Sequence, residues 1–193
     1  MIRSYLRRRC RPDIVVASVQ EIDPEALRAR GIRALLLDLD NTLVMWRSFD
    51  LRAEVSAWVE RARRAGLQLC IVSNTSSTRR VEPVARQLGI PYTARAAKPS
   101  RRAFRRAAAL LGVSPSQVAV VGDQIFTDVL GGNRAGMLTI LVNPINRNRE
   151  FISTRIMRLL ERLVWGGIHA DRVALAPAAE RECRETRRSA DTL

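Results

Sequence analysis

The chain has 193 residues, 33 of them basic and 19 acidic, which gives a formal net charge of +14. A content of 47% hydrophobic and 27% charged residues excludes a disordered chain and suits one globular domain. No window holds the ~20 apolar residues of a membrane-spanning helix, and no apolar segment with a cleavage site follows the basic start, so we expect a cytoplasmic protein.

Strands and helices alternate along the chain. Apolar runs bounded by polar residues predict strands at 14–17, 34–39, 67–72, 91–93, 118–121 and 138–142. Amphipathic segments predict helices at 51–65, 78–88, 100–111, 128–134 and 151–165. This alternation predicts an α/β fold, a Rossmann-like three-layer α/β/α sandwich with a mainly parallel sheet that binds ligands at the carboxyl ends of its strands.

The two ends differ from this alternating core. Residues 1–33 carry a weak strand pattern, and we expect them to form a basic N-terminal extension that packs on the core. The core domain is expected to span residues 34–165. Residues 166–193, rich in Ala, Arg and Glu, predict a flexible C-terminal tail.

The counts of cysteine and histidine exclude several chemistries. Cys10, Cys70 and Cys183 are odd in number and far apart, which argues against a disulfide framework and a cysteine zinc site. His169 is the only histidine, so neither a Ser-His-Asp triad nor a multi-histidine metal site can form. Every basic residue is arginine except Lys98. Because a compact ammonium differs chemically from a planar guanidinium, we interpret Lys98 as functional.

Four aspartates fall at or just beyond predicted strand ends. Asp38 and Asp40 are two residues apart, so their carboxylates emerge on the same side if the strand continues. Asp123 and Asp128 follow the strand at 118–121. Carboxylates that converge on one sheet edge repel one another, and a hard cation relieves that repulsion. Since Mg²⁺ usually binds one or two carboxylates together with a substrate phosphate, the sequence predicts a Mg²⁺ site here.

Donors for a phosphate follow the neighbouring strands. Ser73 and Asn74 come directly after the strand at 67–72, where a hydroxyl and backbone N–H groups can hold phosphoryl oxygens. Lys98 lies on the loop before the next helix, and Pro99 fixes the chain there. An ammonium near an aspartate nucleophile and a phosphate would neutralise charge in the transition state.

The order of these motifs resembles that of the haloacid dehalogenase (HAD) superfamily. The four matching segments are Asp38-Leu-Asp-Asn-Thr-Leu, Ser73-Asn74, Lys98-Pro99 and Gly122-Asp-Gln-Ile-Phe-Thr-Asp128. The longer run 122–136 is similar to the YqeG-type branch of the subclass IIIA phosphatases. That branch is itself similar to the eukaryotic phosphatidylglycerophosphate phosphatases. The resemblance covers roughly residues 12–145.

The resemblance implies a Mg²⁺-dependent phosphomonoester hydrolase that forms an aspartyl-phosphate. Asp38 would attack phosphorus, while Asp40 would protonate the leaving oxygen and later activate water. The Asp38 carboxylate, the Asp40 main-chain carbonyl and Asp123 would hold Mg²⁺, with Asp128 in support. Of the remaining motif residues, Ser73 and Asn74 would bind phosphoryl oxygens, and Lys98 would pair with Asp38 and the phosphate.

The spacing of the motifs leaves no room for a cap domain. HAD enzymes insert their lids after the first strand or between the second and third motifs. Here residues 45–50 permit only a small flap, and residues 75–97 are filled by a helix and a short strand. We therefore interpret 34–165 as a capless HAD-like phosphatase domain. An open site favours a macromolecular or membrane-held phosphomonoester over a small metabolite, and we expect the substrate to be the anionic lipid phosphatidylglycerophosphate, which yields phosphatidylglycerol.

The charge distribution also favours an anionic substrate. No acidic residue lies between Glu82 and Asp123. One face of the helix at 100–111 carries Arg101, Arg102, Arg105 and Arg106, opposite Ala103, Ala107 and Leu110. These arginines would steer anions, although a solvated helix face gives the same pattern. Trp46 and the basic residues 7–9 suit peripheral contact with the inner membrane face, but they equally suit a lid residue and an ordinary basic end.

Three other functions fit parts of the pattern. The same chemistry would serve a soluble sugar, nucleotide or protein phosphate. A receiver-like module would accept phosphate without turnover, but receivers place the lysine after the last strand. A nucleic-acid-binding protein fits the charge of +14, but with 5% aromatic residues and no stacking motif or zinc finger we expect no specific nucleic acid. The sequence does not indicate an oligomeric state.

Overall fold

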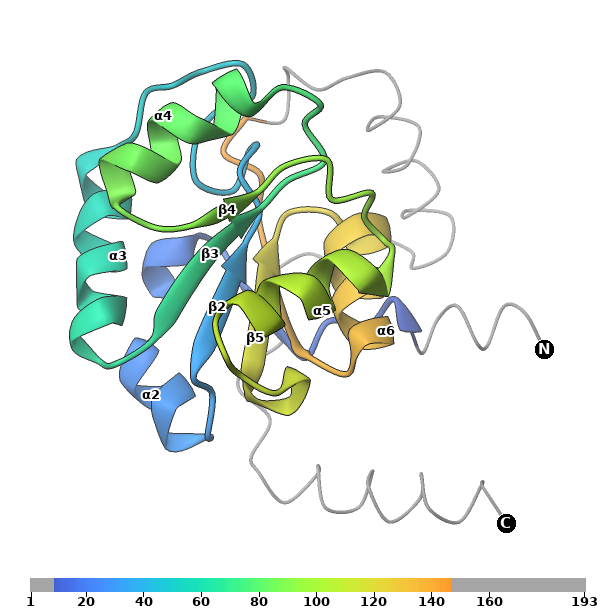
Figure 1. The fold of residues 1–193 in the computed structure, drawn as a ribbon. Coiled ribbons are helices and arrows are strands. Elements are labelled where there is room, and N and C mark those ends of the chain that lie inside the picture. Colours follow the sequence, from blue (N-terminus) through green and yellow to red (C-terminus); the bar gives the residue numbers. More distant parts are fainter. Residues whose placement is uncertain (1–8, 147–193) are drawn as a thin grey trace, which may run out of the picture.

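The computed structural model describes residues 9–146, which contain one parallel sheet of six strands (Figure 1). Its strand order is β1-β6-β5-β2-β3-β4. The strands are β1 (Ile14–Val16), β2 (Ala34–Leu37), β3 (Gln68–Val72), β4 (Tyr92–Thr93), β5 (Val118–Gly122) and β6 (Leu138–Val142). All five pairings are parallel, which confirms the predicted α/β fold.

Helices cover both faces of this sheet. The helices are α2 (Pro24–Ala29), α3 (Ala53–Arg64), α4 (Thr78–Leu88), α5 (Arg101–Leu110) and α6 (Leu130–Ala135). Short turns of helix are η1 (Val19–Glu21), η2 (Pro115–Gln117) and the π turn η3 (Ile125–Val129). The first three helices pack on one face, and α5 and α6 pack on the other, as Figure 1 shows.

The central strand β2 explains why the sequence carries continuous apolar runs. Its four residues are fully buried: Leu35 and Leu37 pack toward α3, whereas Ala34 and Leu36 pack toward α5. Because both faces of a parallel sheet are covered by helices, both sets of side chains must be apolar. The register pairs Leu35 with Leu69 of β3 and with Ala119 of β5, so the ends of these three strands lie at one edge.

Most predicted elements match the structure closely, and the differences have local causes. The strand predicted at 34–39 ends at Leu37, because the carbonyl of Leu39 accepts from the amides of Leu43 and Val44 in a turn. The helix predicted at 128–134 begins earlier, as η3, and continues as α6. The helix predicted at 151–165, the basic residues 7–9 and the tail at 166–193 lie wholly or mainly outside the described residues.

Helix α2 was not predicted, although its start carries a recognisable signal. The side chain of Asp23 accepts hydrogen bonds from the amides of Glu25 and Ala26, and Pro24 occupies the first turn. An N-cap aspartate followed by proline is typical of a helix start. The helix has only six residues, which is too short to show an apolar periodicity.

The assignment of faces on α5 was wrong at one position. The four arginines are exposed as predicted, but Leu110 is 61% exposed rather than buried. The buried face consists of Ala103, Phe104, Ala107 and Ala108. Leu110 lies in the last turn, and the burial of Phe104 and Ala108 rotates the contact face of α5 away from it.

Two further observations bear on the sequence predictions. Cys10 and Cys70 are both buried. Burial raises the pKa of the Cys70 thiol to about 11, so it stays protonated at neutral pH. Within residues 9–146, every helix is too short or too polar to span a lipid bilayer.

Close packing of α5 on α6 yields a stability prediction. A Cβ at Gly131 would overlap the Phe104 ring, so Gly131→Ala should destabilise the fold by about 1–3 kcal/mol. Phe104→Leu should offset part of that loss in the double variant, because the smaller side chain vacates the space. Urea unfolding of the wild type, both single variants and the double variant measures the coupling. Strictly additive losses would contradict this packing.

Candidate active site

Polar residues gather where the three central strands end. Asp38 follows β2, Ser73 follows β3, and Asp123 follows β5. Since these strands are adjacent and parallel, their carboxyl ends bring the three side chains to the same edge of the sheet. This is the edge at which open α/β sheets bind ligands.

Three aspartates form the centre of the site. One carboxylate oxygen from each of Asp38, Asp123 and Asp128 lies within 4.8 Å of the others. All three residues are buried, with exposed fractions of 7%, 2% and 2%. Such an all-oxygen donor set, with more negative than positive groups, fits a hard divalent cation of the Mg²⁺ type.

Lys98 neutralises part of this charge. Its Nζ donates hydrogen bonds to Oδ1 of Asp38 and, at 2.6 Å, to Oδ1 of Asp128. The lysine side chain is 3% exposed, so these ion pairs are shielded from water. Charge-assisted hydrogen bonds are strong in such surroundings, and they fix the orientation of both carboxylates.

Asn74 holds the backbone that carries Lys98. The amide nitrogen of Lys98 donates to Oδ1 of Asn74 at 2.7 Å, and Nδ2 of Asn74 donates to the Lys98 carbonyl at 3.2 Å. The side-chain amide predicted to bind phosphate is therefore engaged with the lysine loop. Ser73 is buried, and its Oγ accepts from the amide of Thr75 at 3.2 Å, which leaves the hydroxyl proton available to another acceptor.

The π turn η3 brings Asp128 back toward β5. Oδ2 of Asp128 accepts from the amide of Gln124 and from Oγ1 of Thr127, both at 3.3 Å. A Cβ at Gly122 would overlap the Asp128 side chain. The close approach of the Asp128 side chain therefore explains why position 122 is a glycine.

Burial and charge set the ionisation of the site. Burial raises the pKa of Asp38 to about 7; Lys98 opposes the increase, and the neighbouring carboxylates of Asp128 and Asp40 add to it. Burial alone would lower the pKa of Lys98, but Asp128 and Asp38 outweigh burial and hold that pKa above its ordinary value. Lys98 is therefore a permanent cation at neutral pH.

Asp40 lies apart from the buried cluster. Because β2 ends at Leu37 and Asn41 adopts a left-handed conformation (φ 61°), the chain turns before a regular strand could align the carboxylates of Asp38 and Asp40. The Asp40 side chain is 24% exposed and forms an ion pair with Arg80 of α4. It occupies the rim of the site, next to the flap at 45–50.

Sequence reasoning missed Arg80. Its position in the first turn of the helix after the Ser73-Asn74 motif was a usable signal, because that turn begins near the same sheet edge. Arg79 carries the same signal but is exposed. The two arginines differ only in the direction that the rotation of α4 gives them: Arg80 contacts Asp40, whereas Arg79 is exposed to solvent.

Comparisons with known proteins agree with this geometry. Residues 18–136 match the family model described as a hydrolase, haloacid dehalogenase-like hydrolase. The chain is 40% identical over 153 residues to the probable phosphatase YqeG of Bacillus subtilis, covering 79% of this chain and 88% of the relative.

More distant relatives have longer chains. Identity is 27% over 179 residues to the chloroplastic phosphatidylglycerophosphate phosphatase 1 of Chlamydomonas reinhardtii, covering 86% of this chain and 66% of that protein.

The fold is also that of an uncharacterized protein from Listeria monocytogenes, with a TM-score of 0.51 and 19% identity. The match covers 63% of this chain and 87% of that chain.

The raised pKa of Asp38 predicts how stability depends on pH. In metal-free buffer, folded Asp38 retains a proton up to a pKa of about 7, whereas its ordinary value is 3.8, so ionisation lowers wild-type stability as pH rises between these values. Asp38→Asn lacks this ionisation, and its stability relative to wild type should increase from pH 4 to 7.

Urea unfolding in EDTA at several pH values measures this difference. Glu54→Gln removes an exposed carboxylate from α3 and supplies the baseline for an acid-to-amide change. If the difference in free energy of unfolding between Asp38→Asn and the wild type stays constant with pH, the raised pKa of Asp38 is contradicted.

Proposed function

Since this chain belongs to the haloacid dehalogenase-like hydrolases, we propose that it is a Mg²⁺-dependent phosphomonoester hydrolase with an aspartyl-phosphate intermediate. One observation supports this proposal above all: Lys98 joins Asp38 and Asp128 beside Asp123 at the carboxyl ends of the central strands. A buried carboxylate held by an ammonium is oriented for attack on an electrophile, and the surrounding positive charge suits a phosphate.

In the first step, a carboxylate oxygen of Asp38 attacks phosphorus. The bond from phosphorus to the ester oxygen breaks, and protonated Asp40 donates its proton to the leaving alcohol. In the second step, Asp40 takes a proton from water while the water oxygen attacks phosphorus. The bond between phosphorus and Asp38 then breaks, which releases inorganic phosphate and restores both aspartates.

The remaining residues hold the phosphate and its charge. The Ser73 hydroxyl donates a hydrogen bond to a phosphoryl oxygen, and Lys98 supplies a fixed positive charge beside Asp38. Asn74 acts by positioning Lys98. The Mg²⁺ ligands in this proposal are the carboxylates of Asp38 and Asp123 and the main-chain carbonyl of Asp40, with Asp128 in support. Bound Mg²⁺ supplies positive charge that stabilises the developing charge on the phosphate.

The proposed substrate is phosphatidylglycerophosphate, and the proposed product is phosphatidylglycerol. Two relatives carry that substrate in their names, although this chain spans only 66% and 45% of their lengths. Residues 75–97 hold only α4 and β4, so nothing in that stretch forms a cap over the site. An open site gives access to a phosphate that projects from a bilayer.

The rim of the site supports peripheral contact with that bilayer. On the flap, Phe49 is 54% exposed, and the Arg47 guanidinium lies 4.5 Å from the centre of the Trp46 ring. Aromatic rings with arginine are favoured at a membrane interface. The four exposed arginines of α5 make no ion pair with any residue in 9–146, so their charge is available to anionic headgroups.

Asp38→Asn tests the proposed chemistry. Phosphate release from p-nitrophenyl phosphate in Mg²⁺ should fall to background, because an amide is a poor nucleophile toward phosphorus. EDTA should abolish release by the wild type, and added Mg²⁺ should restore it. Glu60→Gln, on the exposed side of α3, serves as a control that retains full activity. Undiminished turnover by Asp38→Asn would exclude the mechanism.

A substrate panel tests the lipid assignment separately. The ratio kcat/KM for phosphatidylglycerophosphate in mixed micelles should exceed that for sugar phosphates, nucleotides and phosphopeptides. Higher activity on a soluble phosphate would assign the enzyme to that substrate class. Such an outcome leaves the aspartyl-phosphate chemistry intact and removes only the lipid proposal.

A further inference from the structure

We propose that Arg80 is a positioning residue that orients Asp40 and ties it to the flap at residues 45–50. This inference rests on the proposed function, because it concerns the general acid and base of that reaction. Arg80 belongs to none of the four motifs and lies on a different element from Asp40. Its role follows from its contacts with both the carboxylate and the flap.

Arg80 grips one oxygen of the Asp40 carboxylate. Its Nε donates to Oδ1 at 3.0 Å, and its Nη2 donates to the same oxygen. The two side chains are only 15% and 24% exposed, so the ion pair is partly shielded from solvent. Two donors from a planar group fix the direction of the carboxylate as well as its position.

The second oxygen of Asp40 stays available for proton transfer. Its Oδ2 makes no hydrogen bond with any residue among 9–146, whereas Oδ1 accepts both bonds from Arg80. A general acid and base must reach the leaving oxygen and then the attacking water. Arg80 therefore binds the oxygen that does not exchange the proton and leaves Oδ2 for the reaction.

The same guanidinium also contacts the flap. Nη2 donates to the carbonyl of Met45 at 3.4 Å, and Nη1 donates to the carbonyl of Ser48 at 3.5 Å. The guanidinium carbon lies 5.8 Å from the centre of the Phe49 ring. A single side chain thus connects α4, the proposed acid and base, and the loop at the mouth of the site.

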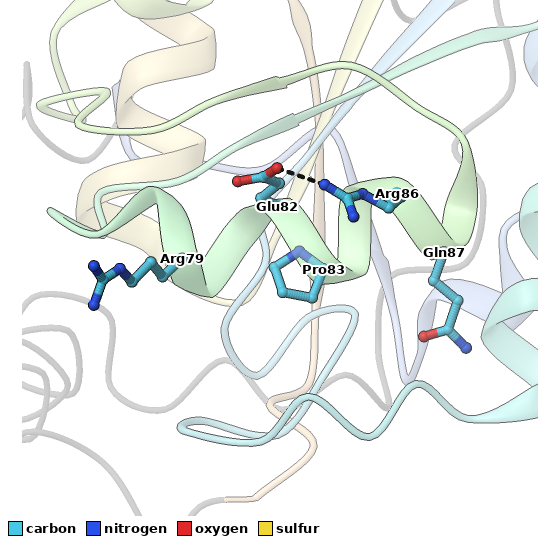
Figure 2. Close-up of a pocket in the computed structure, with 5 residues that line it drawn as sticks. All are labelled: Arg79, Glu82, Pro83, Arg86 and Gln87. Atoms are coloured by element: carbon cyan, nitrogen blue, oxygen red, sulfur yellow. Dashed lines mark hydrogen bonds and ion pairs between the residues drawn. The ribbon is translucent and has the colours of Figure 1, made fainter.

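Arg79 provides a matched control within the same turn of α4. It is exposed and lines an open groove of about 540 Å³ with Glu82, Pro83, Arg86 and Gln87. Figure 2 shows these side chains along the outer side of the helix. Replacing Arg79 removes the same charge from a neighbouring position without touching Asp40 or the flap.

The experiment compares an alkyl phosphate with an aryl phosphate. An alkoxide leaves poorly without a proton, whereas p-nitrophenolate leaves readily, so misplacement of Asp40 should chiefly harm cleavage of the alkyl ester. For Arg80→Gln we expect kcat/KM to fall by about 10- to 100-fold for glycerol phosphate and by much less for p-nitrophenyl phosphate. Arg79→Gln should match the wild type on both substrates.

Arg80→Lys distinguishes charge from geometry. Lysine keeps the positive charge, but it cannot reproduce the two bonds to Oδ1 while contacting both flap carbonyls, so we expect intermediate activity on glycerol phosphate. Thermal unfolding of each variant in Mg²⁺ reports whether it is folded at the assay temperature.

The outcomes separate this inference from the proposed function. If Arg80→Gln loses kcat/KM equally on both substrates, or is as active as Arg79→Gln, the positioning role is overturned while the hydrolase proposal stands. If the wild type releases phosphate from neither of these esters nor from phosphatidylglycerophosphate, both the positioning role and the hydrolase proposal are overturned.

Discussion

The site depends on one buried ammonium group. Lys98 lies between Asp38 and Asp128 with its side chain 3% exposed, so two carboxylates share its charge away from water. Without that cation, the desolvation of adjacent carboxylates would oppose folding. The reciprocal bonds between Asn74 and the Lys98 backbone matter for this reason. They hold in place the loop on which the charge balance of the site relies.

The sheet determines which residues can share that cation. Asp38 and Asp123 come from adjacent strands, whereas Asp128 returns to the edge through the π turn and Lys98 arrives from the loop before α5. The buried cluster is thus held by rigid elements, while Asp40 lies on a turn at the rim and is fixed by Arg80. The site combines a buried charged centre with a partly exposed rim.

The sheet and the approach of Asp38, Asp123 and Asp128 to its edge were predictable because both produce local patterns, whereas the position of Asp40 outside the buried cluster was not. Strands covered on both faces require apolar runs, and the polar residues that end them mark the ligand-binding edge. Arg80 and Leu110 were not predictable in this way. The rotation of α4 separates Arg80 from Arg79, and the rotation of α5 buries Phe104 and exposes Leu110. Both depend on tertiary packing, which one sequence does not display.

The short strand β1 has a consequence for solubility. Its three residues pair with β6, and the Asp13 carboxylate accepts from the amide of Thr139 at 2.9 Å and from its hydroxyl at 3.0 Å. Without β1, the five-residue strand β6 would form this edge of the sheet and would expose unpaired backbone N–H and C=O groups. Such borders recruit other chains into intermolecular sheets. A fragment that starts at residue 34 would retain every motif and yet be prone to self-association.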